Sequence, residues 1–191
     1  MKALIIDTSV QSVLCIALAG EAEHIVDELP HSGTNTSMNI IPLVDEALSG
    51  VALRVDDLDV VAVVVGPGSF TGLRIGVSVA NAFATKGISM LGVNLLDMLS
   101  DGQGDDVLCA LPSRAGFCYT DRGEMAVADV AQCLSIGTEG TGAQRVLTRN
   151  EYVAKLIAYV RRHVEGAVKA PVEPLYLKKS QAERLREERR D

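Results

Sequence analysis

The run Val60–Val65 restricts the fold of this chain most, because it holds six consecutive apolar residues without polar alternation. A strand of this kind is buried on both faces, as in the middle of an α/β sheet. A glycine-rich turn, Gly66-Pro-Gly68, follows directly. The pattern then predicts a helix from about Thr71 to Lys86, which Gly87 would end. A buried strand, a glycine turn and a helix in this order indicate the α/β fold class.

The rest of the N-terminal half extends this pattern. Two short β-rich runs, residues 3–6 and 13–18, are predicted to form a hairpin whose connection, Asp7–Ser12, is polar and rich in hydroxyl groups. Apolar residues at helical spacing predict a helix from about Ser37 to Leu48. Further elements are predicted as an edge strand at 25–29, a strand at 88–93 and the start of a helix at 94–100.

The pattern weakens after a polar break at residues 101–106. The chain is therefore predicted to consist of two unequal halves, 1–100 and 101–191. The final helix, at about 175–191, could pack back on the first half. The elements predicted for the second half are strands at 107–111 and 117–120, an amphipathic helix at 152–163 and this final helix.

The charge of the chain argues against a surface that grips nucleic acid. Its formal net charge is −7, whereas affinity for nucleic acid comes from neutralised phosphates. The segment Lys178–Asp191 mixes six basic with four acidic residues. Such a mixed-sign segment is typical of a solvated helix face, which we favour over an RNA contact.

The four cysteines stand at positions 15, 109, 118 and 133 and form no CxxC pair, so neither a zinc site nor a disulfide framework is predicted. A reduced, cytoplasmic setting fits this usage. No export signal and no apolar run of membrane-spanning length is apparent. We therefore expect a cytoplasmic protein without a membrane partner.

The glycine turn and the first hairpin allow two interpretations each. A strand, a glycine turn and a helix N-terminus can bind phosphate, and the candidates here are Gly66, Gly68 and Ser69. The glycines miss the spacing of the known phosphate motifs, so a tight turn is the favoured interpretation. In the hairpin, Asp7-Thr8-Ser9 can wrap a nucleotide phosphate, with the aspartate holding a metal-bound water. It can equally be a turn that its own side chains stabilise.

A ridge of small residues runs along the predicted helix 71–86. Gly72, Gly76, Ala80 and Ala84 fall four residues apart, and each helical glycine costs about 1 kcal/mol relative to alanine. Close approach of another helix, as in a contact between subunits, would explain them. Tight packing of this helix on its own sheet would explain them equally well.

The sequence offers no constellation for chemistry. The histidines at 24, 31 and 163 form no metal-binding pair, and no G-x-S-x-G elbow occurs. Ser69 has no nearby histidine or lysine in the sequence to activate it. No catalytic residue and no metal ligand is therefore predicted.

Four segments resemble the bacterial TsaB (YeaZ) family. The segment Gly66-Pro-Gly-Ser-Phe-Thr-Gly-Leu-Arg-Ile-Gly76 is highly specific, and three weaker ones occur in the right order: Ile5–Ser9, Gly92-Val93 and Glu173–Lys178. The resemblance implies an actin-like, sugar-kinase-type (ASKHA) fold of two related subdomains with a reduced second half. It also implies a non-catalytic role in making threonylcarbamoyladenosine beside the anticodon of tRNAs.

The resemblance further implies how such a subunit works. It would bind and position the catalytic subunit TsaD through the first two helices, here about 37–49 and 71–86, and the ATPase TsaE would join them. A homodimer is expected in isolation, and tRNA would be contacted indirectly. No cofactor is expected to bind tightly, and ATP or ADP with magnesium would bind only within the complex. The interface residues that we predict are Ile41, Val44, Leu48, Gly72, Gly76 and Ala80.

The chain departs from the family pattern before the first helix, at Thr36-Ser37-Met38, and at residues 110–116, and its second half is short. These departures affect a substrate site between the halves rather than the pairing helices. Two other functions therefore stay open. One is an independent ATP-dependent kinase or hydrolase that uses the Asp7 hairpin and the glycine turn, and the other is a free-standing regulatory homodimer.

Overall fold

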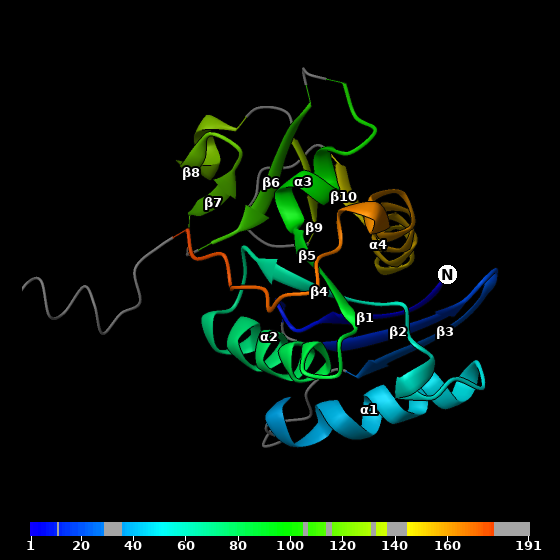
Figure 1. Cartoon of the computed structure of the whole chain (residues 1–191). Coiled ribbons are helices and arrows are strands. Elements are labelled where there is room, and N and C mark those ends of the chain that lie inside the picture. The colour runs from blue at the N-terminus through cyan, green and yellow to red at the C-terminus, as the bar shows by residue number, and fades with distance from the viewer. Residues whose placement is uncertain are drawn as a thin grey trace, which may run out of the picture.

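The computed structural model describes residues 1–10, 12–28, 36–104, 107–113, 116–130, 133–136 and 145–177. These residues form two five-stranded sheets with α-helices packed against them (Figure 1). The helices are α1 (Thr36–Gly50), α2 (Phe70–Ala84), α3 (Leu95–Ser100) and α4 (Arg149–His163). Single 3₁₀ turns lie at Val55–Asp57, Val127–Asp129 and Val164–Gly166.

The first sheet has the strand order β3-β2-β1-β4-β5. Strands β1 to β3 form an antiparallel meander, and β4 and β5 add to β1 in parallel. The predicted hairpin, the predicted edge strand and the valine run are thereby confirmed. The strands are β1 (Lys2–Asp7), β2 (Val13–Ala19), β3 (Ala22–Glu28), β4 (Val60–Gly66) and β5 (Ser89–Asn94).

The second sheet repeats this topology. Read from the other end, its order is β8-β7-β6-β9-β10. Again three antiparallel strands are followed by two parallel ones. Its connections are short, because only residues 137–144 separate the parallel strands β9 and β10. The strands are β6 (Leu108–Pro112), β7 (Phe117–Thr120), β8 (Gly123–Ala126), β9 (Cys133–Ile136) and β10 (Arg145–Leu147).

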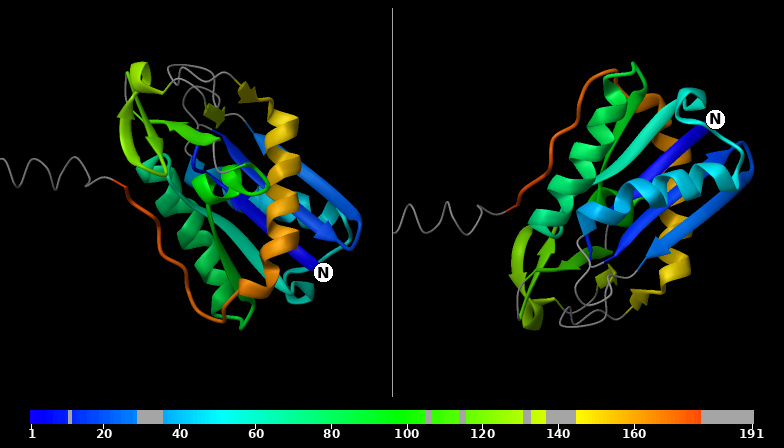
Figure 2. Two further views of the ribbon diagram at one scale, coloured as in Figure 1. Left: turned by 90° about the horizontal axis from the view of Figure 1, so that it is seen from above. Right: turned by 90° about the horizontal axis from the view of Figure 1, so that it is seen from below.

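Both faces of the first sheet are buried, and successive side chains of its strands alternate between two cores. Leu4, Ile6 and Val63 belong to the core shared with α1 and α2. Ile5 and Val64 belong to the opposite core, which is shared with α3 and α4. Figure 2 shows α1 and α2 on one side of this sheet and α4 on the other. The second of these cores also contains side chains from β6 and β9, so it joins the two halves.

An extended segment, residues 168–177, returns from the second half to the first and runs along α2 (Figure 2). Val168 and Met90 of β5 exchange backbone hydrogen bonds of 2.8 and 2.9 Å. Asn81 of α2 donates to the Val172 carbonyl and accepts from its N–H, both at 2.9 Å. The Leu175 N–H donates to the Val65 carbonyl at 2.7 Å. We call residues 168–177 the strap.

The predicted final helix, about 175–191, lies almost entirely outside the described residues. Residues 175–177 are described and are not helical. The strands β8, β9 and β10 were not predicted, because each holds only three or four residues and shows no long periodic pattern. Every element predicted for the first half is present with small shifts of its ends.

Candidate functional site

The structure brings the first hairpin and the glycine turn into direct contact at the carboxyl ends of β1 and β4. The Ser69 N–H donates to the Ser9 carbonyl at 2.7 Å. The Thr8 hydroxyl donates to the Gly72 carbonyl, also at 2.7 Å. At Gly68 there is no room for a side chain, since a Cβ would lie 2.5 Å from the Ser9 carbonyl oxygen. All the residues that the sequence proposed for a phosphate loop therefore lie in one cluster, with Gly66 at its start.

The carboxylate of Asp7 is fully buried in this cluster, and both of its oxygens accept hydrogen bonds. One oxygen accepts from the Ser9 N–H at 2.8 Å and from the Ser9 hydroxyl at 2.6 Å. The other accepts from the hydroxyl of Tyr152, on α4, at 2.6 Å. The hairpin is thus a turn stabilised by its own side chains and closed by a residue from the second half.

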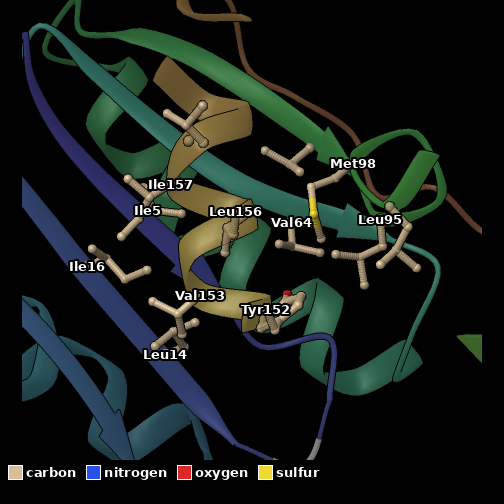
Figure 3. Close-up of a cluster of buried hydrophobic side chains, with 14 of the residues drawn as sticks. Ile5, Leu14, Ile16, Val64, Leu95, Met98, Tyr152, Val153, Leu156 and Ile157 are labelled. Carbon is tan, nitrogen blue, oxygen red and sulfur yellow. The ribbon is translucent and has the colours of Figure 1, made fainter. Parts of the chain in front are cut away.

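Tyr152 is buried among apolar side chains. Figure 3 shows Val153, Leu156 and Ile157 of the same helix packed towards Ile5 and the neighbouring strand β2. Burial, together with the nearby negative charge of Asp7, raises the pKa of Tyr152 well above its usual value of 10. The tyrosine therefore remains protonated and donates to the aspartate.

Arg149 lies one turn before Tyr152, with its guanidinium carbon 5.3 Å from the centre of the Tyr152 ring. Its guanidinium forms a two-pronged ion pair with Asp27 of β3, at 2.6 and 2.7 Å, and donates to the Ser12 hydroxyl at 3.0 Å. Burial by itself would lower the pKa of Arg149. The hydrogen bond to Asp27 and the negative charges of Asp27 and Asp7 outweigh this effect, so the pKa is raised. The first turn of α4 is thereby fixed to β3 and to the connection between β1 and β2.

Tyr152 and Arg149 were not singled out from the sequence. A local signal was present, because Thr148 and Glu151 form a capping box that fixes the start of α4 just before Tyr152. That signal places a tyrosine on the buried face of a helix. It does not reveal that its partner lies 145 residues away in the sequence.

The small-residue ridge of α2 faces the inside of the chain. A Cβ at Gly72 would lie 2.0 Å from the Thr8 carbonyl oxygen, and one at Gly76 would lie 2.2 Å from the Thr8 hydroxyl oxygen. Ala80 is fully buried in the core under α1 and α2. Of the two interpretations of the ridge, tight packing within the chain accounts for the glycines, because the backbone of the hairpin approaches them closely.

The other predicted interface residues separate into two groups. Val44 and Leu48 are buried in the same core as Ala80. Ile41 is 57% exposed on the outer surface of α1. Five of the six predicted interface positions are therefore buried within the chain, because α1 and α2 turn those residues towards their own sheet and hairpin. The partner interface itself stays a prediction.

A partly exposed apolar row on α2 was missed. Ile75, Val79 and Phe83 follow one another at four-residue intervals, pack against the core from its edge and remain partly accessible. These three residues and the exposed Ile41 of α1 are apolar side chains that the two helices leave accessible, and we call the four together the helix-pair strip. On α2, each residue of the strip directly precedes one of the small residues of the ridge in the sequence, so the strip and the ridge lie on neighbouring faces of that helix.

A pocket of about 410 Å³ lies between the two halves. Its lining comes from α3, β6, the turn between β7 and β8, and Leu177, and it includes none of the six residues of the hairpin and glycine cluster. Residues 114 and 115, in one of the segments that depart from the TsaB pattern, lie outside the described residues.

Among the residues that the structure describes, no group of histidine, cysteine or acidic side chains is arranged to hold a metal ion. Cys15, Cys109 and Cys118 are buried. Burial and the charge of Asp7 raise the pKa of Cys15 to about 12. In the same described part of the chain, no helix is long and apolar enough to cross a bilayer.

Comparison with known proteins supports the resemblance to the TsaB family. Residues 31–112 match the model of the TsaD family, tRNA N6-adenosine threonylcarbamoyltransferase. The chain is 35% identical over 124 residues to the tRNA threonylcarbamoyladenosine biosynthesis protein TsaB of Bacillus subtilis. The matched region covers 63% of this chain and 54% of that protein. It is 28% identical over 123 residues to the TsaB protein of Haemophilus influenzae, which covers 61% of this chain and 51% of that protein.

The fold is shared with a solved structure. A Pseudomonas aeruginosa protein described as similar to peptidase YeaZ superposes with a TM-score of 0.68 at 22% identity, covering 93% of this chain and 99% of that one. This likeness and the repeated strand order confirm the actin-like, ASKHA-type fold with a reduced second half. The chain spans about half the length of the curated relatives that it matches.

Proposed function

We propose that this chain, a relative of the TsaB proteins, is a non-catalytic partner subunit for the synthesis of threonylcarbamoyladenosine in tRNA. It would bind and position a TsaD-type catalytic subunit. The observation that carries this proposal is the helix-pair strip, an apolar surface that two helices present outside the core. Both helices lie within or at the edge of the segment that matches the TsaD family model.

The composition of the strip supports contact with another apolar surface. Ile41 leaves more than half of its side chain in water, and such area stabilises an interface by roughly 25 cal/mol per Å² when it is buried. Arg74 lies beside the strip on α2 and stacks over the Phe70 ring at 4.1 Å. Aromatic residues and arginine are enriched where partners bind. The strip therefore replaces the buried glycine ridge as the interface that we propose.

The buried cluster around Asp7 agrees with a non-catalytic subunit, because its polar groups bond to one another. We propose further that TsaE joins the complex and that the chain forms a homodimer through the same helices when TsaD is absent. In this proposal tRNA is contacted only through the complex, ATP or ADP with magnesium binds only within it, and the protein acts in the cytoplasm.

The interface is tested by placing a charge on the strip. Ile41→Glu and Val79→Glu should each weaken binding of the TsaD protein from the same cell by at least about tenfold, because burial of an unpaired carboxylate costs more than about 1.4 kcal/mol. Titration calorimetry with the purified proteins measures this. Ala154 is an exposed position of α4, on the opposite face of the sheet. Ala154→Glu is therefore the matched control and should bind the TsaD protein normally.

Unchanged affinity in both strip variants, with a native circular-dichroism spectrum, would contradict the interface. The role in tRNA modification is tested separately by depleting the protein in its own cell and measuring threonylcarbamoyladenosine in total tRNA. Undiminished modification after depletion would contradict the role even if TsaD binds.

A further inference from the structure

We infer that the Asp7 hairpin does not bind a magnesium-bound nucleotide, because Tyr152 of the same chain occupies the Asp7 carboxylate. Asp7 serves instead to anchor α4. An actin-like, sugar-kinase-type fold leads one to expect nucleotide and metal beside an acidic hairpin of this kind. The residues present do not fit that group, as three features of the described structure demonstrate.

The first feature is the state of the carboxylate. Three hydrogen bonds of 2.6 to 2.8 Å, from the Ser9 N–H, the Ser9 hydroxyl and the Tyr152 hydroxyl, engage both oxygens of Asp7. Magnesium keeps most of its water shell and reaches carboxylates directly or through those waters. A carboxylate offers about four acceptor positions, and these three donors occupy most of them. The full burial of Asp7 leaves no open side from which a water could approach.

The second feature is that the hydrogen-bond donors of the hairpin and the glycine turn already bond to groups of the chain itself. The hydroxyls of Thr8 and Ser9 donate to the Gly72 carbonyl and to Asp7. The Ser69 N–H donates to the Ser9 carbonyl, and the Gly72 N–H donates to the Ser69 hydroxyl oxygen at 3.2 Å. Each of these donors therefore already has a partner within the cluster, and a phosphate would have to break such bonds to be held here.

The third feature is the anchorage of the closing residue. The Tyr152 side chain is itself buried in the core, and Val153, Leu156 and Ile157 bury the same helix against the first sheet. Arg149, one turn earlier, holds the helix start to Asp27 and Ser12. Opening the hairpin to a nucleotide would thus require α4 to leave the sheet. The hydrogen bond between Asp7 and Tyr152 joins the two halves.

The inference is tested first on the unaltered full-length chain. Titration with ATP and magnesium, and with magnesium alone, should produce neither binding heat nor a shift of the melting temperature at millimolar ligand. A stabilising shift with ATP and magnesium that Asp7→Asn abolishes would overturn the inference.

The anchoring role is tested by a double-mutant cycle between the two residues. Tyr152→Phe removes only the hydroxyl and should lower the melting temperature by roughly 5 °C, because a bond to a buried carboxylate is lost. In an Asp7→Asn background the same change should lower it much less, because the two substitutions remove one shared interaction. Tyr159→Phe on the same helix, whose ring stacks on His163, is the control and should have little effect.

Additive shifts for Asp7→Asn and Tyr152→Phe would overturn the anchor. If Tyr152→Phe does not fold, the anchoring role is tested on Asp7→Asn alone, by hydrogen exchange of the α4 amides. In Asp7→Asn these amides should exchange faster, and unchanged exchange would overturn the anchor.

Discussion

At the residue scale, the Thr8 hydroxyl oxygen explains why position 76 of α2 is a glycine. By helix propensity alone, a glycine inside α2 destabilises the helix by about 1 kcal/mol relative to alanine. The structure explains its presence, since an added Cβ would lie 2.2 Å from the Thr8 hydroxyl oxygen, well inside van der Waals contact. The Thr8 hydroxyl cannot withdraw freely, because it donates to the Gly72 carbonyl. The glycine therefore provides space for the hairpin.

Gly76→Ala should consequently destabilise the chain by about 1 to 2 kcal/mol, since overpacking outweighs the gain in helix propensity. In a Thr8→Ala background the same substitution should become neutral or stabilising, because the clashing oxygen is gone. Urea unfolding of the four proteins measures the two effects. Ser78→Ala, on the exposed side of the same helix, controls for propensity. Equal effects of Gly76→Ala in both backgrounds would contradict this explanation.

At the scale of elements, the strap is the connection that ties the end of the described chain to the first half. It forms no regular helix or long strand, so its backbone groups need other partners. Asn81 supplies two of these at Val172, Val65 near the end of β4 supplies one at Leu175, and Met90 of the edge strand β5 supplies two at Val168. Tyr176 adds a ring contact with Phe70, with centroids 4.6 Å apart. The strap is thus held by separate polar contacts, while Val172 and Leu175 pack against the core under α1 and α2.

Asn81→Ala should free the middle of the strap while leaving the sheet intact. We expect the Val172 and Leu175 amides to exchange with solvent at least about tenfold faster, which corresponds to a loss of about 1.4 kcal/mol in local opening. Hydrogen exchange followed by mass spectrometry resolves this. Asn150→Ala, an exposed asparagine on α4, is the control. Unchanged protection of the strap would indicate that its apolar contacts suffice.

At the scale of the whole molecule, one apolar core runs through both halves and encloses the Asp7 cluster. The side chains of β1, β4, α3, α4, β6 and β9 contribute to it. Loss of the buried polar contacts should therefore reduce the stability of the complete chain rather than that of one half. Two of the buried groups with raised pKa values, Cys15 and Tyr152, make this dependence measurable as a function of pH.

The free energy of unfolding should fall as the pH rises above about 9. Cys15 and Tyr152 keep their protons in the folded chain beyond the pH at which they ionise when unfolded, so the stability that they contribute is complete below about pH 9 and declines above it. Each group adds at most about 1.4 kcal/mol per pH unit. Urea unfolding between pH 7.5 and 10.5 measures the slope. Tyr152→Phe should reduce the slope above pH 10, and an unchanged slope would contradict the assignment.

The sequence by itself determined the elements of the first half and the fold class. Six apolar residues in a row at Val60–Val65, five of them β-branched and followed by a glycine-proline turn, favour a strand buried on both faces, and the structure confirms it. Such information is local, because backbone geometry and the spacing of apolar residues express it within about 15 positions. The glycine segment also carried the resemblance to TsaB proteins, since it combines this geometry with specific residues.

Only the tertiary structure decided what these elements face. The spacing of Gly72, Gly76 and Ala80 is the same whether a partner helix or the chain's own hairpin lies against them, and the structure places Thr8 there. Asp7 likewise suits a metal-bound water or a tyrosine hydroxyl, and the structure supplies Tyr152 from a distant helix. Both choices depend on long-range packing, which brings together residues that no local pattern relates.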